Sequence, residues 1–418
     1  MAVPFALRAL RHRNFQLFAA GQTISLIGSW MQQLAMGWLV YRLTNSPFLL
    51  GLVAFGAQGP TFILAPIAGA VADRSNRHRM VLLAQIAMML QACILAALVV
   101  TGTVKIWHVL ALSTFYGCAS AVDIPARQSF LQEMVSTRDE LANAIALNSS
   151  MFNAARLIGP ALAGLLIAQF GEGAAFVINA LSYIAVIGAL LAMRFEPRVL
   201  VVQTENLFAT LRQGFRYAYT FSPIRDVLSL VAAVALFGVP FTVLMSIFAV
   251  QMLHGDARTL GWLMSATGLG ALGGALFLAQ RKNVRGLSKV IAFCAALFGA
   301  ALIVFALSRS FATSLIALAV AGFGMMVQMA ASNTFLQTVV EDDKRGRIVS
   351  LYTMAYIGVA PLGSLLAGAV AERITAPVTL AIGGGVCIVS ALLFARQIPR
   401  FRELVGPIYQ QLGIITEQ

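Results

Sequence analysis

Long apolar stretches dominate the pattern of hydrophobic and polar positions along this chain. Ten of them contain no Asp, Glu, Lys or Arg, and each reaches the roughly 18 residues that indicate a membrane-spanning helix. They occupy residues 14–41, 43–72, 80–104, 173–193, 227–255, 259–280, 290–308, 310–340, 348–371 and 374–395. Two further stretches, at about 106–130 and 141–170, contain the charged residues Asp123, Arg127 and Arg156. The pattern predicts an all-α integral membrane protein with twelve transmembrane helices.

The charged residues predict the orientation of these helices. Only 11% of the 418 residues are charged, yet the net charge is +13. Counted over alternate loops from the N-terminus, 23 of the 29 Lys and Arg fall on one side, five fall on the other and Arg156 lies within a span. Because loops rich in Lys and Arg stay in the cytoplasm, we expect both termini to be cytoplasmic. This distribution explains the basicity, so we expect no nucleic-acid partner.

The chain also repeats itself at an offset of about 205 residues. Ser129–Gln132 returns as Thr334–Gln337, and each copy precedes a helix with a Pro and an Ala-Gly pair. Two related six-helix halves explain such a repeat most simply. We therefore expect four parts: an N-terminal half at 1–194, a cytoplasmic linker at 195–223, a C-terminal half at 224–396 and a cytoplasmic tail at 397–418.

The linker has the pattern of an amphipathic helix lying on the membrane surface. Arg212 and Arg216 lie away from an apolar helical face that carries Leu207, Phe208, Leu211, Phe215 and Tyr219. A structural tether between the halves is the simpler role for this helix, and a regulatory role is the alternative.

A compact turn of acidic and basic residues, Gly69–Arg79, lies between the second and third predicted helices. Its pattern Gly69-x-x-x-Asp73-Arg74-x-x-Arg77 resembles motif A of the major facilitator superfamily. Other segments resemble the branch of enterobactin-exporter-like proteins, the transmembrane secretion effectors: Gly21-Gln22, Ser25–Gln32, Trp38–Tyr41, Ser46-Pro47, Pro125–Gln128, Asn143-Ala144 and Arg156–Gly164. The resemblance implies the major facilitator fold in a bacterial inner membrane, and a monomeric secondary transporter, with export by alternating access.

The same turn is predicted to latch one conformational state. A carboxylate such as Asp73 interacts favourably with the positive N-terminal end of a neighbouring helix, and the resemblance suggests the eleventh helix, which starts near Arg347. Arg127 is a second predicted partner. The expected latch residues are Gly69, Asp73, Arg74, Arg77 and Arg127. The alternative is that these charges only cap helices and fix the topology.

Three charged residues within predicted spans are candidates for proton coupling. A charge at mid-membrane costs about 2.5–3.5 kcal/mol on insertion scales, so retained charges tend to be paired and functional. Asp123 and Arg127 are four residues apart and share a helical face, and Arg156 comes from the next helix. Asp123 is either a proton-sensing group released from its partner on protonation, or part of a static buried ion network with Arg127 and Arg156.

A polar stripe in the first helix and thioether-rich positions elsewhere predict a substrate cavity. In this superfamily helices one, four, seven and ten line the central cavity, so we expect it to be lined by Gln22, Ser25, Ser29, Gln32, Phe241, Met245, Met325, Met326, Met329 and Asn333. Such a lining suits adaptable binding of amphipathic solutes. Polar packing between helices is the alternative for each single Gln or Asn.

The fifth helix carries Gly159, Pro160 and Gly164, which permit close packing or a bend. The superfamily's exporters have a Gly-Pro-rich motif here, which favours efflux. No nucleophile-base pair, Walker motif or metal-ligand cluster is present, so we expect no enzyme activity, no metal and no cofactor, with a proton gradient as the driving force. The predicted function is proton-coupled export of small amphipathic molecules, such as drugs or siderophores. A lysophospholipid flippase of the same fold is the alternative, and a receptor or scaffold and an uptake transporter are further alternatives.

Overall fold

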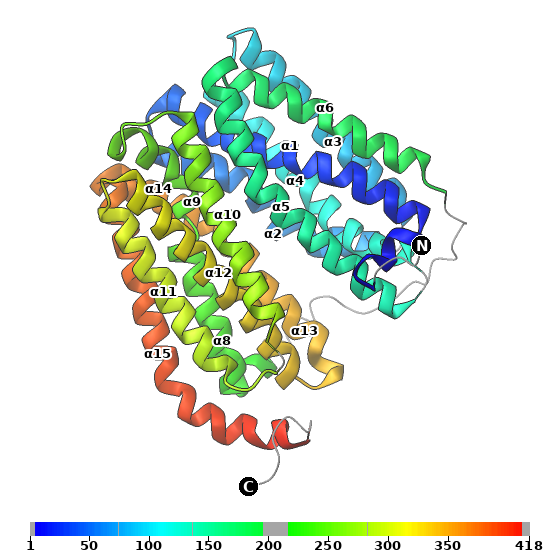
Figure 1. Cartoon of the computed structure of the whole chain (residues 1–418), viewed down its shortest axis with the longest axis vertical. Helices are drawn as coiled ribbons and strands as arrows, with labels where there is room; N and C mark the ends of the chain where they lie inside the picture. The colour runs from blue at the N-terminus through cyan, green and yellow to red at the C-terminus, as the bar shows by residue number, and fades with distance from the viewer. Residues whose placement is uncertain (1–4, 74, 136, 195–215, 282, 412–418) are drawn as a thin grey trace. The chain divides into compact units, whose positions relative to one another are not determined.

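The computed structural model describes residues 5–73, 75–135, 137–194, 216–281 and 283–411, and every regular element within them is helical (Figure 1). These helices fall into two compact units. The first contains Met1–Thr204 together with Gly255–Ser265, and the second contains Glu205–His254 together with Ala266–Gln418. The arrangement in two six-helix halves and the boundaries 1–194, 195–223, 224–396 and 397–418 stay predictions.

The first unit is built from six long helices and two short 3₁₀ helices. They are η1 (Phe5–Arg11), α1 (Arg13–Thr44), α2 (Pro47–Asp73), α3 (Arg77–Val100), α4 (Ile106–Leu131), η2 (Gln132–Met134), α5 (Arg138–Phe170) and α6 (Glu172–Ala192). The segment Gly255–Ser265, which includes the start of α10 (Ala257–Ala279), groups with this unit.

The second unit combines α-helices with three π-helical segments. Its elements are α8 (Ser222–Ala233), η3 (Val234–Gly238), α9 (Phe241–Ile247), η4 (Phe248–Met252), the remainder of α10, α11 (Leu287–Leu307), α12 (Phe311–Val339), α13 (Asp342–Thr353), η5 (Met354–Gly358), α14 (Ala360–Ile374) and α15 (Ala376–Gln411).

Eleven helical runs among the described residues are long and apolar enough to cross a membrane. Two of them join several elements: Ser222–Met252 runs from α8 to η4, and Lys344–Ile374 runs from α13 to α14. The remaining long helix, α1, has 32 residues, which correspond to about 48 Å at 1.5 Å per residue, against about 30 Å for the hydrocarbon core. Its length suffices, but its polar stripe lowers its hydropathy. Twelve spans therefore stay a prediction.

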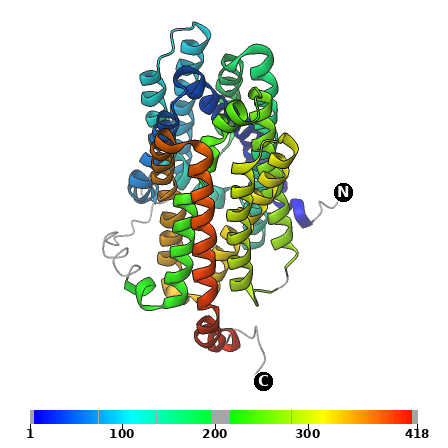
Figure 2. The ribbon, with the colours of Figure 1, turned by 90° about the vertical axis from the view of Figure 1, so that its left-hand side faces the viewer.

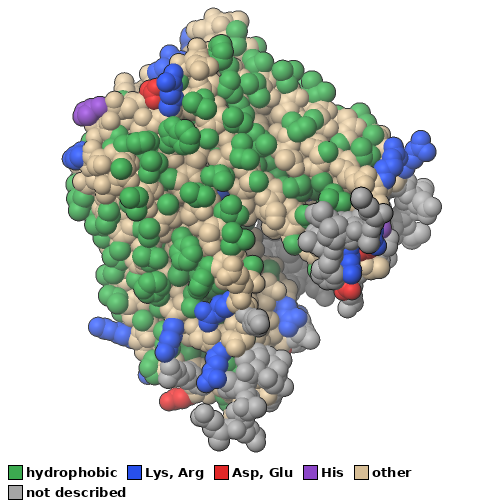
Figure 3. All heavy atoms as spheres, in the orientation of Figure 1, with side chains coloured by type: hydrophobic (Ala, Val, Ile, Leu, Met, Phe, Trp, Pro, Cys, Tyr) green, Lys and Arg blue, Asp and Glu red, His purple; other side chains and the backbone are tan. Residues whose placement is uncertain are grey.

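The outer surfaces of the spans are apolar, as contact with lipid chains requires. Large hydrophobic side chains are exposed on several different helices, including Ile63, Leu83, Phe293 and Ile316. Figure 3 shows hydrophobic side chains spread over the visible face, with most Lys and Arg toward its rim. Surface of this kind in water would be an aggregation liability, whereas in a bilayer it is the expected exterior.

In the first unit, α1 packs along α5 and α6, while α3 packs along α4 and α6 (Figures 1 and 2). Close approach of α1 to α6 depends on glycine. A Cβ atom added at Gly28 would lie 2.3 Å from Oγ of Ser182 and 2.7 Å from Oδ1 of Asn179. Small residues at such crossings bring helix backbones together, and here they bring polar side chains of the two helices into hydrogen-bonding range.

In the second unit, α11 packs against both α12 and α15. Aromatic pairs join further elements of this unit: Phe241 of α9 meets Phe298 of α11 edge to face, with ring centroids 5.9 Å apart, and Phe335 of α12 stacks on Phe401 of α15 at 6.0 Å. Aromatic pairs in this range of separation add stabilisation beyond the area they bury.

Two π-helical segments of the second unit lie next to prolines. η3 precedes Pro240 and η5 precedes Pro361. Proline lacks the backbone N–H that continues a helix, and wide π turns occur frequently at functional sites. A Cβ atom at Gly363 of α14 would meet the carbonyl oxygen of Leu236 in η3. The irregular part of one helix therefore packs closely on the other.

The repeated sequence segments occupy equivalent places in the two units. Phe130 lies at the end of α4 and Phe335 near the end of α12, and both side chains are almost fully buried. Each copy thus ends a long helix by burying an aromatic ring, as internal repeats predict.

The linker and the tail differ in how far they are described. Leu207, Phe208, Leu211, Arg212 and Phe215 lie outside the described residues, so the amphipathic helix stays a prediction. Near the end of the expected linker, the Tyr217 ring makes a cation–π contact: the Lys344 ammonium lies 4.7 Å from the ring centroid. The last helix, α15, continues through most of the expected tail to Gln411 despite Pro399 and Pro407.

Candidate functional site

The predicted pair Asp123 and Arg127 is formed in the first unit. Nη2 of Arg127 lies 2.7 Å from Oδ2 of Asp123. Asp123 is 1% exposed, whereas the Arg127 side chain is 25% exposed. One turn of α4 separates the two residues, so helix geometry alone brings them together. The carboxylate is buried, and the cation that neutralises it reaches toward the outside of the unit.

A third residue, which the sequence reasoning missed, completes the surroundings of this carboxylate. Nε2 of Gln85 on α3 donates a hydrogen bond of 2.9 Å to Oδ1 of Asp123. Gln85 is itself buried, and its Oε1 atom has no hydrogen-bond partner in the described part of the chain. The sequence signal for it was that Gln85 is one of two Gln, with Gln91, in an otherwise apolar span. Asp123 thus has one charged donor on its own helix and one neutral donor on the neighbouring helix.

Gln32 of the predicted cavity stripe lies in an amide cluster between helices. Nε2 of Gln32 donates to Oε1 of Gln91 at 3.1 Å, and Nδ2 of Asn179 donates to Oε1 of Gln32 at 2.7 Å. Ser182 Oγ donates to the carbonyl of Asn179 at 2.8 Å. This arrangement has the geometry of polar packing between α1, α3 and α6, which is the alternative for a single Gln. A cavity-lining role for Gln32 stays a prediction.

The other residues of the stripe are also largely inside the first unit. Gln22 and Ser25 are buried, and Oε1 of Gln22 is without a hydrogen-bond partner among the described residues. Ser29 is half-buried, and its Oγ donates to the carbonyl of Ser25 at 2.9 Å. An intrahelical bond of this kind satisfies a hydroxyl within an apolar span.

Arg156 contacts aromatic residues near the middle of α5. Its guanidinium carbon lies 5.9 Å from the centroid of the Trp30 ring of α1. Trp30 in turn meets Phe152 edge to face, with ring centroids 5.6 Å apart. The structure therefore brings Arg156 together with Trp30 and Phe152, and brings Asp123 together with Arg127 and Gln85. A single network of all three charged residues stays a prediction.

The turn after α2 is described in part. Arg74 lies outside the described residues, as do the surroundings of Gly69 and the side chain of Asp73, so the latch through Asp73 stays a prediction. Arg77 is described: its Nη1 atom lies 3.1 Å from Oε1 of Glu133. This ion pair joins the start of α3 to η2, and the sequence reasoning did not identify Glu133.

The predicted cavity residues of the second unit divide into buried and half-buried groups. Phe241, Met245 and Met325 are buried, while Met326, Met329 and Asn333 are half-buried. Asn333 accepts a hydrogen bond of 3.1 Å from Nε2 of Gln337. The half-buried residues are spaced as one helical face of α12, which is the spacing expected of a face lining a passage.

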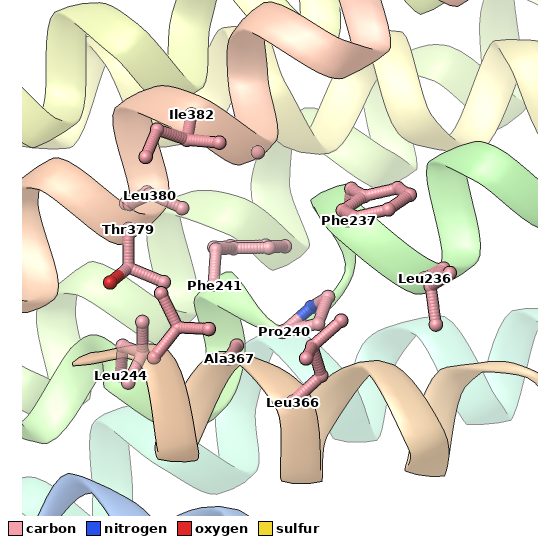
Figure 4. A pocket seen from close by; sticks show the side chains of 12 residues that line it. Leu236, Phe237, Pro240, Phe241, Leu244, Leu366, Ala367, Thr379, Leu380 and Ile382 are labelled. Atoms are coloured by element: carbon pink, nitrogen blue, oxygen red, sulfur yellow. The ribbon is translucent and has the colours of Figure 1, made fainter. Parts of the chain in front are cut away.

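Phe241 also lines a small apolar crevice within the second unit, with a volume of about 80 Å³ (Figure 4). Its walls come from η3, α9, α14 and α15, and they include Leu236, Leu244, Leu366 and Ile382. Leu366 and Ile382 are also exposed on the outside of the unit. The hydroxyl of Thr379 is bonded to the carbonyl of Thr375. The crevice therefore offers apolar contacts and no unpaired hydroxyl.

The glycines of the fifth helix make close contacts, as the packing interpretation expects. A Cβ atom at Gly159 would lie 2.6 Å from Cβ of Trp30, and one at Gly164 would lie 2.7 Å from the carbonyl oxygen of Ala257. Pro160 lies inside the continuous helix α5. Close packing is therefore observed at both glycines, while a functional bend at Pro160 stays a prediction.

The chain is similar along most of its length to one protein family and to several known transporters. The family model described as transmembrane secretion effector matches residues 4–405. The staphyloferrin A transporter of Staphylococcus aureus is 24% identical over 90% of this chain and 95% of its own. The multidrug efflux pump Tap of Mycolicibacterium fortuitum is 25% identical over 90% and 93%. The enterobactin exporter EntS of Salmonella typhimurium is 25% identical over 94% of both chains.

Solved structures of similar fold include transporters with little sequence identity. A POT family transporter in complex with 5-aminolevulinic acid has a TM-score of 0.72 at 11% identity, over 93% of this chain and 96% of its own. A bacterial homolog of the human lysosomal transporter Spinster, inward-facing and unoccupied, has a TM-score of 0.64 at 15% identity, over 94% and 96%. At these identities the likeness concerns the fold alone.

Proposed function

The chain belongs to the transmembrane secretion effector family of the major facilitator superfamily, and on this basis we propose that it is a secondary active exporter of small amphipathic molecules. It is a multi-pass membrane transporter and not an enzyme. Two relatives similar over at least 90% of both chains are an enterobactin exporter and a multidrug efflux pump. Their names support export of siderophores or drug-like compounds over a lipid flippase, the alternative for this fold.

The buried ion pair of Asp123 and Arg127 carries the proposal of proton coupling. The Asp123 carboxylate is 1% exposed, and Arg127 and Gln85 both donate to it, as a carboxylate buried in a protein interior requires. Protonation of Asp123 removes the negative charge, so the bond to Arg127 weakens and Arg127 turns toward its exposed side. We propose that this exchange couples proton entry to a change of conformation. No cofactor is required, since the proton gradient drives transport.

The turn Gly69–Arg79 supports an alternating-access cycle in the proposal. Asp73, Arg74, Arg77 and Arg127 would latch one state, with the Arg77–Glu133 ion pair at 3.1 Å anchoring the turn to η2. The expected location is the bacterial inner membrane with both termini in the cytoplasm, because the Lys and Arg lie mainly in alternate loops. We expect the protein to work as a monomer.

Transport into proteoliposomes tests the proposed function. Purified protein is reconstituted, a pH gradient is imposed, and uptake of fluorescent amphipathic dyes and a catecholate siderophore is measured for wild type and Asp123→Asn. At least one solute should move only with the gradient, and the variant should lose the gradient dependence. Asp139→Asn, at an exposed carboxylate at the start of α5, is the matched control and should behave as wild type. Equal gradient dependence in wild type and Asp123→Asn would exclude Asp123 as the coupling group.

A headgroup comparison separates the exporter from the flippase. The same vesicles are prepared with fluorescent lysophospholipids in place of the solutes. Movement of these lipids between leaflets at a rate that depends on the headgroup, with no movement of the solutes, would favour the flippase.

A further inference from the structure

One face of α5 combines polar, aromatic and cationic side chains inside a membrane span. Ser149, Phe152, Asn153 and Arg156 follow the i, i+3, i+4, i+7 spacing of a single helical face. Ser149 and Phe152 are exposed, while Asn153 and Arg156 are half-buried. We name these four residues the α5 polar face.

This face lies deep in the span and not at its end. Arg156 is about 25 Å from the start and about 21 Å from the end of the span Asp139–Phe170, at 1.5 Å per residue. An exposed polar surface at this depth does not lie against lipid, because hydrocarbon satisfies neither charge nor hydrogen bonds. The α5 polar face therefore borders water, where solutes reach it.

Trp30 of α1 extends the α5 polar face with a large aromatic surface. It lies under the Arg156 guanidinium at 5.9 Å and against the Phe152 ring at 5.6 Å. The helices carrying these side chains are locked close together, because a Cβ atom at Gly159 would clash with Trp30. Two aromatic rings and one guanidinium are thus held in fixed relative positions.

The chemistry of this cluster selects a particular class of molecule. Guanidinium binds carboxylates and related anions through a planar pair of N–H donors, and it also stacks on aromatic faces. Half-exposed Phe and Trp offer offset or edge-to-face contacts to a further ring. A solute with an aromatic ring and an adjacent anionic group meets both requirements, whereas an aliphatic anion or a neutral aromatic meets one.

We propose that Arg156, Trp30 and Phe152 form a substrate subsite for aromatic anions, an assignment that rests on the proposed export function. Arg156 holds the anionic group, and the two rings hold the aromatic part. The role differs from that of Asp123, which is buried with Arg127 and Gln85 and senses protons. Substrate recognition and proton coupling are therefore assigned to different side chains of the first unit.

Equilibrium dialysis of the purified full-length protein tests the subsite without any transport step. The probes are 1-naphthoate, the neutral aromatic 1-naphthylmethanol and the aliphatic anion decahydro-1-naphthoate. Wild type should bind 1-naphthoate about tenfold or more tightly than either other probe, as expected for one lost charge-assisted or aromatic contact. Similar affinity for all three probes would overturn the proposal.

Variants assign the preference to individual side chains. Arg156→Gln should weaken 1-naphthoate about tenfold and leave 1-naphthylmethanol unchanged. Trp30→Leu should weaken both aromatic probes and leave decahydro-1-naphthoate unchanged. Arg225→Gln, at a side chain 47% exposed in the second unit, is the matched control and should bind all probes as wild type does. Naphthoate binding by Arg156→Gln within twofold of wild type would overturn the role of Arg156.

Two further measurements keep the outcomes separate. If the apparent Tm shows that Arg156→Gln does not fold, Arg156→Lys replaces it. The Lys variant keeps the positive charge and loses the planar pair of N–H donors, so it should bind 1-naphthoate several-fold more weakly than wild type. Wild-type affinity of the Lys variant would contradict the proposal. Selective binding without gradient-driven transport would overturn the proposed export function and leave the subsite standing. Gradient-driven transport without selective binding would support the proposed export function and overturn the subsite.

Discussion

Nε2 of Gln85 lies 2.9 Å from Oδ1 of Asp123, and both side chains are almost fully buried in the first unit. The bond crosses from α3 to α4, so it ties the proposed proton-sensing carboxylate to a second helix. Arg127 supplies the charge and Gln85 supplies the second donor. Asp123 is therefore positioned by its own helix and by its neighbour, which makes each donor separately testable.

Gln85→Leu should destabilise the protein by about 1.5–3 kcal/mol, because a buried carboxylate loses one of its two donors. Asp123→Asn in the same background should recover part of this loss, since an amide without charge needs the donor less. Thermal unfolding of the four proteins of this double-mutant cycle measures the coupling. Strict additivity of the two substitutions would contradict the bond between these residues.

Asn179→Leu should lower stability by about 1–3 kcal/mol, because Oε1 of Gln32 stays buried and loses its donor. A decrease of several degrees in apparent Tm is the expected reading, at about 2–4 °C per kcal/mol for a unit of this size. Ser150→Ala is the control: Ser150 is exposed and bonds only to the carbonyl of Ala146 among the described contacts. Equal effects of the two substitutions would argue against the amide cluster as a stabilising contact.

Gly28→Val should abolish folding or displace α1 from α6, because the added side chain would overlap Ser182 and Asn179. Gly188→Ala is the matched control within α6, since a Cβ atom there meets nothing within 4 Å. It should be neutral or slightly stabilising, because Ala has the higher helix propensity. The yield of monodisperse protein after extraction separates the two outcomes, and normal yield for Gly28→Val would contradict the packing described for α1.

Arg77→Glu and Glu133→Arg should each slow transport, and the double substitution should restore part of the rate. The two side chains are only 23% and 19% exposed, so each single substitution places like charges together in a mostly buried position and should also lower the apparent Tm. The double variant should recover part of both the rate and the apparent Tm. Transport rates in proteoliposomes and thermal unfolding measure the recovery, and a double variant no faster than either single one would exclude a direct interaction.

The apolar pattern predicted most of the fold because a chain that crosses a bilayer has few alternatives to forming helices. Nine of the ten charge-free runs overlap helical runs that are long and apolar enough to cross a membrane, and the repeat placed Phe130 and Phe335 at equivalent helix ends. The π-helical segments η3 and η5 were not predicted, although Pro240 and Pro361 marked the irregular helices. Their form depends on packing between helices, as at Gly363 and Leu236, which no local pattern contains.

Sequence reasoning found part of the candidate site for a similar reason. Asp123 and Arg127 lie four residues apart on one helix, so their pairing followed from helix geometry alone. Gln85 and Glu133 contact these charged regions across helices, and their partners depend on which faces meet. Gln32 shares a helical stripe with Gln22, Ser25 and Ser29, but its hydrogen bonds to Gln91 and Asn179 depend on contacts with α3 and α6 that the stripe does not contain.

The central claim is that Asp123 exchanges a proton as substrate moves, and counting protons tests it most directly. Purified wild type and Asp123→Asn are mixed with a transported solute in weakly buffered solution containing a pH-sensitive dye. Wild type should release protons on binding the solute, with one proton per bound molecule as the most that a single titrating group can supply. The variant should bind the solute and release none. Equal proton release from both proteins would contradict the account.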